Sequence, residues 1–185
     1  MLNIPARLIA ALLLPLLLAG GAMAQTTKPA APAAKPAAKP AASGPKSMGK
    51  FDDWTAATHD ESGVMACYAF TRAATSSPAL PGRGAVILTV TQRPSLRDAV
   101  AIEAGFAFPD KATVTVQVDQ AGLEFYTDKR NAFARDGKAA AAAFQTGARA
   151  VVRSPGPHNA PVTDTFSLKG FGPAYAAIVK ACPPK

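Results

Sequence analysis

The sequence contains few of the side chains that enzymes most often use for nucleophilic catalysis or metal binding. Two histidines and two cysteines occur among its 185 residues. It has no G-x-S-x-G turn of the serine hydrolases. It also has no glycine-rich phosphate loop, since Gly82-Arg83-Gly84 precedes a predicted strand rather than a helix. The common catalytic motifs are thereby excluded, and the sequence predicts no cofactor.

Long apolar runs are also absent after residue 24. Residues 1–24 resemble a secretory signal peptide, with Arg7 before the apolar run Leu8 to Leu18 and an A-x-A cleavage site at Ala22-Met23-Ala24. The apolar run is about half of the roughly 20 residues that span a bilayer. We therefore expect export of a chain that begins at Gln25. The alternative interpretation is that the run is kept as a membrane anchor.

Residues 25–50 lack aromatic side chains and consist mainly of lysine, proline and alanine, with K-P-A-A at Lys35 and again at Lys39. Such a segment has nothing from which to build a core, so we predict a disordered spacer. Proline biases its neighbours toward extended backbone, so about 25 residues would reach on the order of 75 Å.

The formal net charge of +8 is unevenly distributed along the chain. From Phe51 onward there are 14 Lys and Arg against 12 Asp and Glu, which leaves a net +2 (14 − 12). The spacer carries five lysines that we interpret as an envelope tether: Lys28, Lys35, Lys39, Lys46 and Lys50. Because these charges are sparse and exported, they favour an anionic envelope surface over nucleic acid. A solubilising linker without a partner is the alternative.

Residues 51–185 have the length of one domain with a single core. Period-2 alternation dominates this part, most clearly in "TVTVQVD", where Val114, Val116 and Val118 share one face. A turn cluster at 119–122 and the returning "LEFYT" complete a predicted β-hairpin. Further strands are expected in "DWTAAT", "VMACYAFT", "GAVILTVTQ", "DAVAIEA", "NAFA", "ARAVVRS" and "TDTFSL", with breaks at "HDESG", "TSSPALPGRG" and "PGPHNAP". We predict a mainly β fold, a single antiparallel β-sandwich or partly closed barrel with two short helices.

The two helices are predicted from their termini and their spacing. "DGKAAAAAFQTG" places Asp136 at the N-cap and Gly147 just past the end. "GPAYAAIVKAC" places Pro173 at the first helical position. Tyr175, Ile178, Val179 and Cys182 then share one face, which we expect to pack on the sheet.

The two cysteines of an exported protein most simply pair with each other. Cys67 lies in the second predicted strand and Cys182 on the buried face of the last helix. A bridge would tie the terminal helix to the sheet and close a loop of 115 residues (182 − 67). An intermolecular bridge and a redox-active thiol are the alternatives, although no C-x-x-C motif supports the second.

Short motifs at both ends of the domain are similar to a known family. "FDDWTAA" begins the domain, Cys67-Tyr68 follows in the second strand, and "TDTFSLKGF…AYAAIVKAC" closes it. In this order they resemble the invasion-associated locus B family of Gram-negative bacteria. The resemblance covers residues 51–182 and implies a β-rich exported envelope protein with this cysteine pair. It implies no enzymatic activity and no catalytic residues. The long spacer is not part of the family motif.

Two clusters are candidates for chemistry. His59, Asp60 and Glu61 lie together in "THDESG" and are either metal ligands or a polar turn. His158 lies six residues before Asp164, with Ser154 and Ser167 nearby, and is either part of a Ser-His-Asp arrangement or in a surface loop. In both cases the turn or loop is the favoured interpretation, so we expect no metal.

Three residues are candidates for a binding surface: Trp54, Arg149 and Arg153. Trp54, with Phe51, either anchors a ligand or points into the core. Arg149 and Arg153 flank "AVV" and share one strand face, while Lys129, Arg130 and Arg135 lie elsewhere in the same region. The arginines either form a basic patch for acidic glycans or lipid headgroups, or they form a solvated strand face.

These observations favour a non-enzymatic exported protein of the periplasm or outer membrane surface. Its β domain would bind an envelope or host component while the spacer holds it near an anionic surface. One alternative is a small periplasmic hydrolase or metal-dependent enzyme that uses one of the histidine clusters. Another is an accessory, chaperone-like factor for an envelope assembly.

Overall fold

The computed structural model describes residues 44–185. The predicted signal peptide and most of the predicted spacer lie outside these residues. The strands are β1 (Lys46–Phe51), β2 (Trp54–Glu61), β3 (Val64–Arg72), β4 (Thr75–Ser77), β5 (Ile87–Gln92), β6 (Ala99–Glu103), β7 (Thr113–Val118), β8 (Ala121–Asp128), β9 (Asn131–Ala134), β10 (Arg149–Pro155) and β11 (Pro161–Ser167). The helices are α1 (Gly137–Thr146) and α2 (Phe171–Ala181), and a 3₁₀ turn spans Pro157–Asn159. No helix among residues 44–185 is long and apolar enough to cross a membrane.

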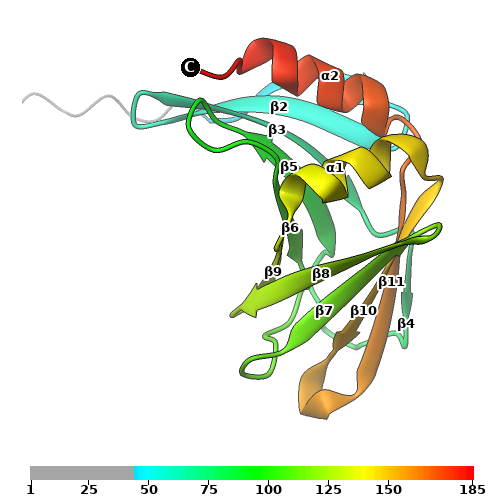
Figure 1. The fold of residues 1–185 in the computed structure, drawn as a ribbon. Helices are drawn as coiled ribbons and strands as arrows, with labels where there is room; N and C mark the ends of the chain where they lie inside the picture. Colours follow the sequence, from blue (N-terminus) through cyan, green and yellow to red (C-terminus); the bar gives the residue numbers. More distant parts are fainter. Residues whose placement is uncertain (1–43) are drawn as a thin grey trace, which may run out of the picture. The chain divides into compact units, whose positions relative to one another are not determined.

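The strands form one antiparallel sheet of 11 strands in the order β1-β2-β3-β5-β6-β9-β8-β7-β10-β11-β4. The sheet curls without closing (Figure 1), which confirms the predicted mainly β, partly closed architecture. Two consecutive residues link its opposite parts: Ala73 N–H donates to Val86 O (3.0 Å), and Ala74 N–H donates to Thr165 O (2.8 Å). The chain thus passes from β3 in one half of the sheet to β4 on its far edge.

The predicted hairpin is confirmed as β7 and β8. Val118 pairs with Ala121, so the turn is the two residues Asp119 and Gln120 and is tighter than the predicted four-residue cluster. The three valines of β7 face inward, as their alternation predicts.

Helix α1 is confirmed with its predicted cap, since the Asp136 carboxylate accepts a hydrogen bond from Ala139 N–H at 2.9 Å. Helix α2 begins at Phe171, two residues earlier than predicted, so Pro173 lies within the first turn rather than at its first position. Of its predicted face, Ile178 and Cys182 are buried, whereas Tyr175 and Val179 are half-buried. Phe171 and Ala174 complete the buried face.

The core lies between the inner face of the sheet and the two helices. Trp54 and Phe171 meet edge to face with ring centroids 4.8 Å apart, and Phe171 also contacts Phe144 of α1 at 5.6 Å. The Trp54 indole N–H donates to Ser167 O at 3.0 Å. These contacts join β2, β11 and both helices, so burial of the aromatic rings holds the curled sheet around one core.

Two predicted boundaries are wrong. The spacer was expected to extend to Lys50, but residues 46–50 belong to β1 and pair with β2. The segment "TSSPALPGRG" was expected to be a break, but its start forms β4 and pairs with β11. In both cases pairing with a neighbouring strand stabilises the strand, because neither has a buried face: β1 has two half-buried positions, Gly49 and Phe51, and β4 is fully exposed.

Candidate binding surface

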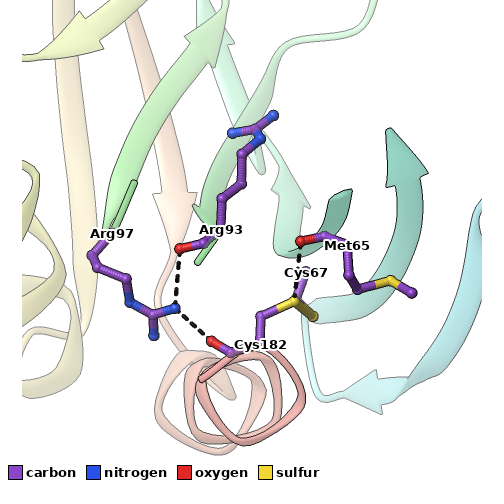
Figure 2. The surroundings of a disulfide bond; sticks show 5 residues. All are labelled: Met65, Cys67, Arg93, Arg97 and Cys182. Atoms are coloured by element: carbon purple, nitrogen blue, oxygen red, sulfur yellow. Dashed lines mark hydrogen bonds between the residues drawn. A yellow bond between two sulfur atoms is a disulfide. The ribbon is translucent and has the colours of Figure 1, made fainter. Parts of the chain in front are cut away.

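The disulfide determines which way the side chains of β3 point. Cys67 and Cys182 are bonded, with Cα atoms 5.9 Å apart, which confirms the predicted pairing. Figure 2 shows the bond between β3 and the end of α2. Because side chains alternate along a strand, Cys67, Ala69 and Thr71 face the helix. The outward side chains of β3 are therefore Tyr68, Phe70 and Arg72.

The usual distribution of side-chain size is inverted on this part of the sheet. Ala56 and Ala69 face α2 and are fully buried, whereas the bulky Tyr68 and Phe70 face away from the core and are half-buried. Small inward residues let the helix approach closely, since α2 packs directly on β2 and β3. Large aromatic rings on the outward face contribute little to that packing, so they need a reason other than the core.

The outward face carries a shallow hollow of about 410 Å³, which we call the outer-face hollow. Its lining comes from four strands and consists of Tyr68, Phe70, Ile87, Thr89, Ala101, Glu103 and Asn131. Cross-strand pairing places Phe70 opposite Thr89, Thr89 opposite Ala101, and Ala101 opposite Phe133. The strands that carry Phe70 and Phe133 are thus about 14 Å apart at the usual strand spacing, with the small residues Thr89 and Ala101 between them.

Aromatic pairs and polar groups border this hollow. The Tyr68 and Phe70 rings lie 6.0 Å apart, and on the other side the Phe133 and Tyr126 rings lie 5.5 Å apart. Glu103 and Asn131 are opposite each other in the β6–β9 pair and supply a carboxylate and an amide at one end. Apolar walls with a few polar groups are the usual composition of a binding site.

The hollow continues along β3. Phe70 also lines a second hollow of about 380 Å³, together with Lys50, Thr55 and Arg72. Lys50, predicted as part of the tether, is therefore an exposed residue of the sheet beside this surface. The alternation Tyr68, Phe70, Arg72 thus presents two aromatic rings and a cation along one outward line.

The sequence does not predict Tyr68 and Phe70 as surface residues, although it contains an indication of their orientation. The predicted bond from Cys67 to a helix packed on the sheet already requires that the residues beside Cys67 face the other way. What the sequence did not show is that α2 needs alanines beneath it, which leaves the aromatic residues outside.

The predicted surface residues do not lie together. Trp54 is completely buried in the core, so its proposed role as a surface anchor is wrong. Arg149 and Arg153 are exposed and share the outward face of β10, which lies in the other half of the sheet. Arg135 lies 3.8 Å from Glu124 and covers the Tyr126 ring at 5.9 Å. Whether Arg149 and Arg153 bind a partner stays a prediction.

The three residues of the His59 cluster are the end of strand β2, so the predicted break at 59–63 is wrong and the turn is only Ser62-Gly63. Asp60 accepts a hydrogen bond from Gly63 N–H at 2.7 Å, within the β2–β3 turn. Glu61 forms two 2.8 Å hydrogen bonds with Arg93, which hold the pKa of this carboxyl below its usual range. Within residues 44–185, no group of three or more His, Cys, Asp or Glu is arranged to hold a metal ion.

The second cluster is not assembled either. His158 is exposed in the 3₁₀ turn, whereas Asp164 is buried and bound by Arg83 and Ser76. Ser154 is buried. Ser167 is half-buried: its hydroxyl accepts from Lys169 N–H at 3.2 Å, and its carbonyl accepts the N–H of the buried Trp54. The alternative Ser-His-Asp arrangement is therefore not formed by these residues, because Asp164 is bound by Arg83 and Ser76 while His158 is exposed in the favoured surface loop.

A family model described as "Invasion associated locus B (IalB) protein" matches residues 54–179. Among solved structures, the chain is similar to the crystal structure of invasion associated protein B from Bartonella henselae, at 17% sequence identity and a TM-score of 0.51. The similarity covers 72% of this chain and 96% of that one, and at this identity it concerns the fold. No curated protein matches the chain.

Proposed function

We propose that this chain, which belongs to the invasion-associated locus B family, is an exported binding module of the cell envelope. Family membership supports the envelope association, and the buried Cys67–Cys182 bond supports export, because such bonds persist in oxidising compartments. The predicted signal peptide in residues 1–24 agrees with this. The location within the periplasm or at the outer membrane surface is part of the proposal.

The outer-face hollow is the observation that carries the binding role. Tyr68 and Phe70 stand on a strand that is fixed by the disulfide on its inner side and by pairing with β2 and β5 on both edges. A rigid strand loses little conformational entropy when a partner docks, so aromatic side chains on it are efficient anchors. The partner we propose is an envelope or host component that contacts these rings.

The basic spacer has a separate role in this proposal. Its lysines attract the chain to an anionic envelope surface, while the folded domain selects the partner. Attraction between exposed charges weakens as salt rises, so the spacer's contribution is the salt-sensitive part of binding.

Crosslinking and pull-down from intact envelopes test the proposal. The exported chain is compared with a Tyr68→Thr/Phe70→Thr variant and with a chain that lacks residues 25–43. Threonine suits a strand, and a thermal melt checks that the double variant is folded. Val151→Thr is the matched control, because Val151 is a half-buried outward residue on β10, in the other half of the sheet.

Loss of a specific partner by the double variant, with capture kept by the Val151→Thr control, is the expected result. A partner captured equally by the double variant would remove the outer-face hollow from the proposal. Capture that depends only on residues 25–43 would leave the lysines as the binding element. Copurification with one stable envelope assembly would instead favour the accessory, chaperone-like role.

A further inference from the structure

Four segments meet at one end of the domain, which we call the hairpin end. They are the start of β1, the β2–β3 turn, the β5–β6 turn and the end of α2. Lys46 pairs with Thr58, and Arg93 binds Glu61. Arg97 donates to Cys182 O, and Met65 O lies 3.6 Å from Cys182 Sγ. Figure 1 shows these segments at the same end of the sheet, and Figure 2 shows the contacts around the disulfide.

Exposed apolar side chains are concentrated at the hairpin end, on both faces of the β2–β3 hairpin. The large apolar side chains exposed by more than a third are five in the described residues, and three of them lie here: Val64 (45%), Met65 (43%) and Leu96 (50%). Val64 and Met65 follow the two-residue turn of the β2–β3 hairpin, and the Met65 side chain points away from the disulfide (Figure 2). Exposed apolar residues scattered singly are ordinary, but three of the five at one end of the domain favour an interaction site at that end.

The turns that carry these side chains are held firmly. In the β5–β6 turn, Arg93 N–H donates to Leu96 O (2.8 Å) and Leu96 N–H donates to Arg93 O (3.3 Å). The Arg97 guanidinium lies between the carbonyls of Arg93 and Cys182 (Figure 2) and connects this turn to the end of α2. The apolar side chains are therefore presented on a rigid base and not on a loose loop.

The charges around the apolar side chains are mostly positive. Lys46 and Lys180 are exposed at this end, and none of the ion pairs among residues 44–185 involves them. Glu61 is neutralised by Arg93. Two other carboxylates lie here: Asp60, which accepts from Gly63 N–H, and the half-buried Asp98 beside Arg97, which accepts from Gln92 and Tyr175. The chain leading into Lys46 is also basic, since residues 1–43 contain no Asp or Glu.

We infer that the hairpin end docks on the surface of an anionic phospholipid bilayer. Val64, Met65 and Leu96 enter the boundary between headgroups and acyl chains, and the exposed Lys46 and Lys180 lie beside the lipid phosphates. Protruding apolar residues surrounded by cations match the chemistry of that boundary, which is apolar below and anionic above. The outer-face hollow lies further along β3 and stays free for a partner, so this inference goes beyond the proposed function.

Vesicle co-sedimentation tests the inference with protein purified from the periplasm of an expression host. The vesicles contain either 30% phosphatidylglycerol in phosphatidylcholine or phosphatidylcholine alone. A Val64→Thr/Met65→Gln/Leu96→Gln variant removes the apolar side chains and keeps every charge. Val151→Thr is the control, because this outward side chain lies on β10, away from the hairpin end.

We expect binding to the anionic vesicles that the triple variant weakens on the order of tenfold, from the loss of apolar insertion. The control variant and the Tyr68→Thr/Phe70→Thr variant should bind as the wild type does, which separates this surface from the outer-face hollow. A chain without residues 25–43 should bind more weakly, yet still better than its own triple variant. Wild-type binding by the triple variant would overturn the inference, and so would equal binding to both kinds of vesicle.

Discussion

Arg83 and Asp164 form a two-pronged ion pair inside the protein, across 81 residues of sequence. Arg83 Nη1 and Nη2 each lie 2.8 Å from one oxygen of the Asp164 carboxylate, and the two side chains are 6% and 2% exposed. Arg83 Nε also donates to Ala104 O at 2.7 Å, and its guanidinium covers the Phe106 ring at 4.8 Å. The pair joins the loop after β4 to β11 and so helps to hold the curled sheet.

Removal of one partner of this pair should destabilise the protein strongly. Asp164→Asn leaves the buried Arg83 charge without a counter-charge, which typically costs about 3–5 kcal/mol of the free energy of unfolding. Denaturant unfolding followed by circular dichroism measures this cost. An Arg83→Met/Asp164→Leu double variant should be more stable than Arg83→Met alone or Asp164→Leu alone, because the double variant leaves no unpaired charge buried. A double variant whose loss is the sum of the two single losses would contradict this account.

The Cys67–Cys182 bond should contribute largely through the unfolded state. Closing a loop of 115 residues removes about 5 kcal/mol of chain entropy in the simplest treatment. We expect Cys67→Ala/Cys182→Ala to lose several kcal/mol of unfolding free energy in guanidinium chloride. The reducing agent dithiothreitol should lower the stability of the wild type and leave the double variant unchanged. Equal stability of the two proteins without reductant would show that the bond does not staple α2 to β3.

Gly170, at the start of α2, has a conformation and a neighbour that exclude a side chain. Its φ is +88°, and an added Cβ would lie 2.0 Å from the Phe51 carbonyl oxygen. Gly170→Ala should therefore cost at least about 2 kcal/mol in unfolding free energy. Gly172→Ala, two residues further along the helix, meets nothing within 4 Å and should be neutral or stabilising by up to about 1 kcal/mol. A thermal melt compares the two, and similar losses in both would argue against this reason.

Tyr175 should make the protein less stable at high pH. The pKa of Tyr175 is raised to about 12. Burial of the hydroxyl is the larger cause, and its 2.6 Å hydrogen bond to Asp98 is the second. An unfolded tyrosine has a pKa near 10, so the unfolded chain loses its proton first. The stabilisation is thus complete below about pH 10 and is lost as the pH rises toward about 12.

Tyr175→Phe should flatten this part of the pH dependence of unfolding. At neutral pH it should cost about 1 kcal/mol, since Asp98 loses one hydrogen-bond donor. Tyr126→Phe changes an exposed tyrosine and is the control, which should keep the wild-type profile. Identical profiles for Tyr175→Phe and the wild type between pH 10 and 12 would contradict the assignment.

Features that depend on neighbouring residues or on side-chain chemistry could be predicted from the sequence alone. Alternation placed the valines of β7 inward, Asp136 capped α1, and the pairing of Cys67 with Cys182 followed from their number and from export. For Trp54, between Asp53 and Thr55, the sequence allowed both a surface anchor and a core residue, and its complete burial shows that it belongs to the core. These predictions follow from the alternation of apolar residues, from a helix-capping residue or from the presence of only two cysteines, all of which can be seen in the sequence without knowing the fold.

Other features depend on contacts between segments that are distant in the sequence, and these contacts exist only in the folded domain. Residues 46–50 and 75–77 become strands because β2 and β11 supply the hydrogen bonds that their own sequences do not demand. Asp164 became a structural residue because Arg83, and not His158, reached it. Tyr68 and Phe70 became an outward surface because α2 requires small residues beneath it. Sheet curvature and helix approach arise from the packing of the whole domain, so no short stretch of sequence contains them.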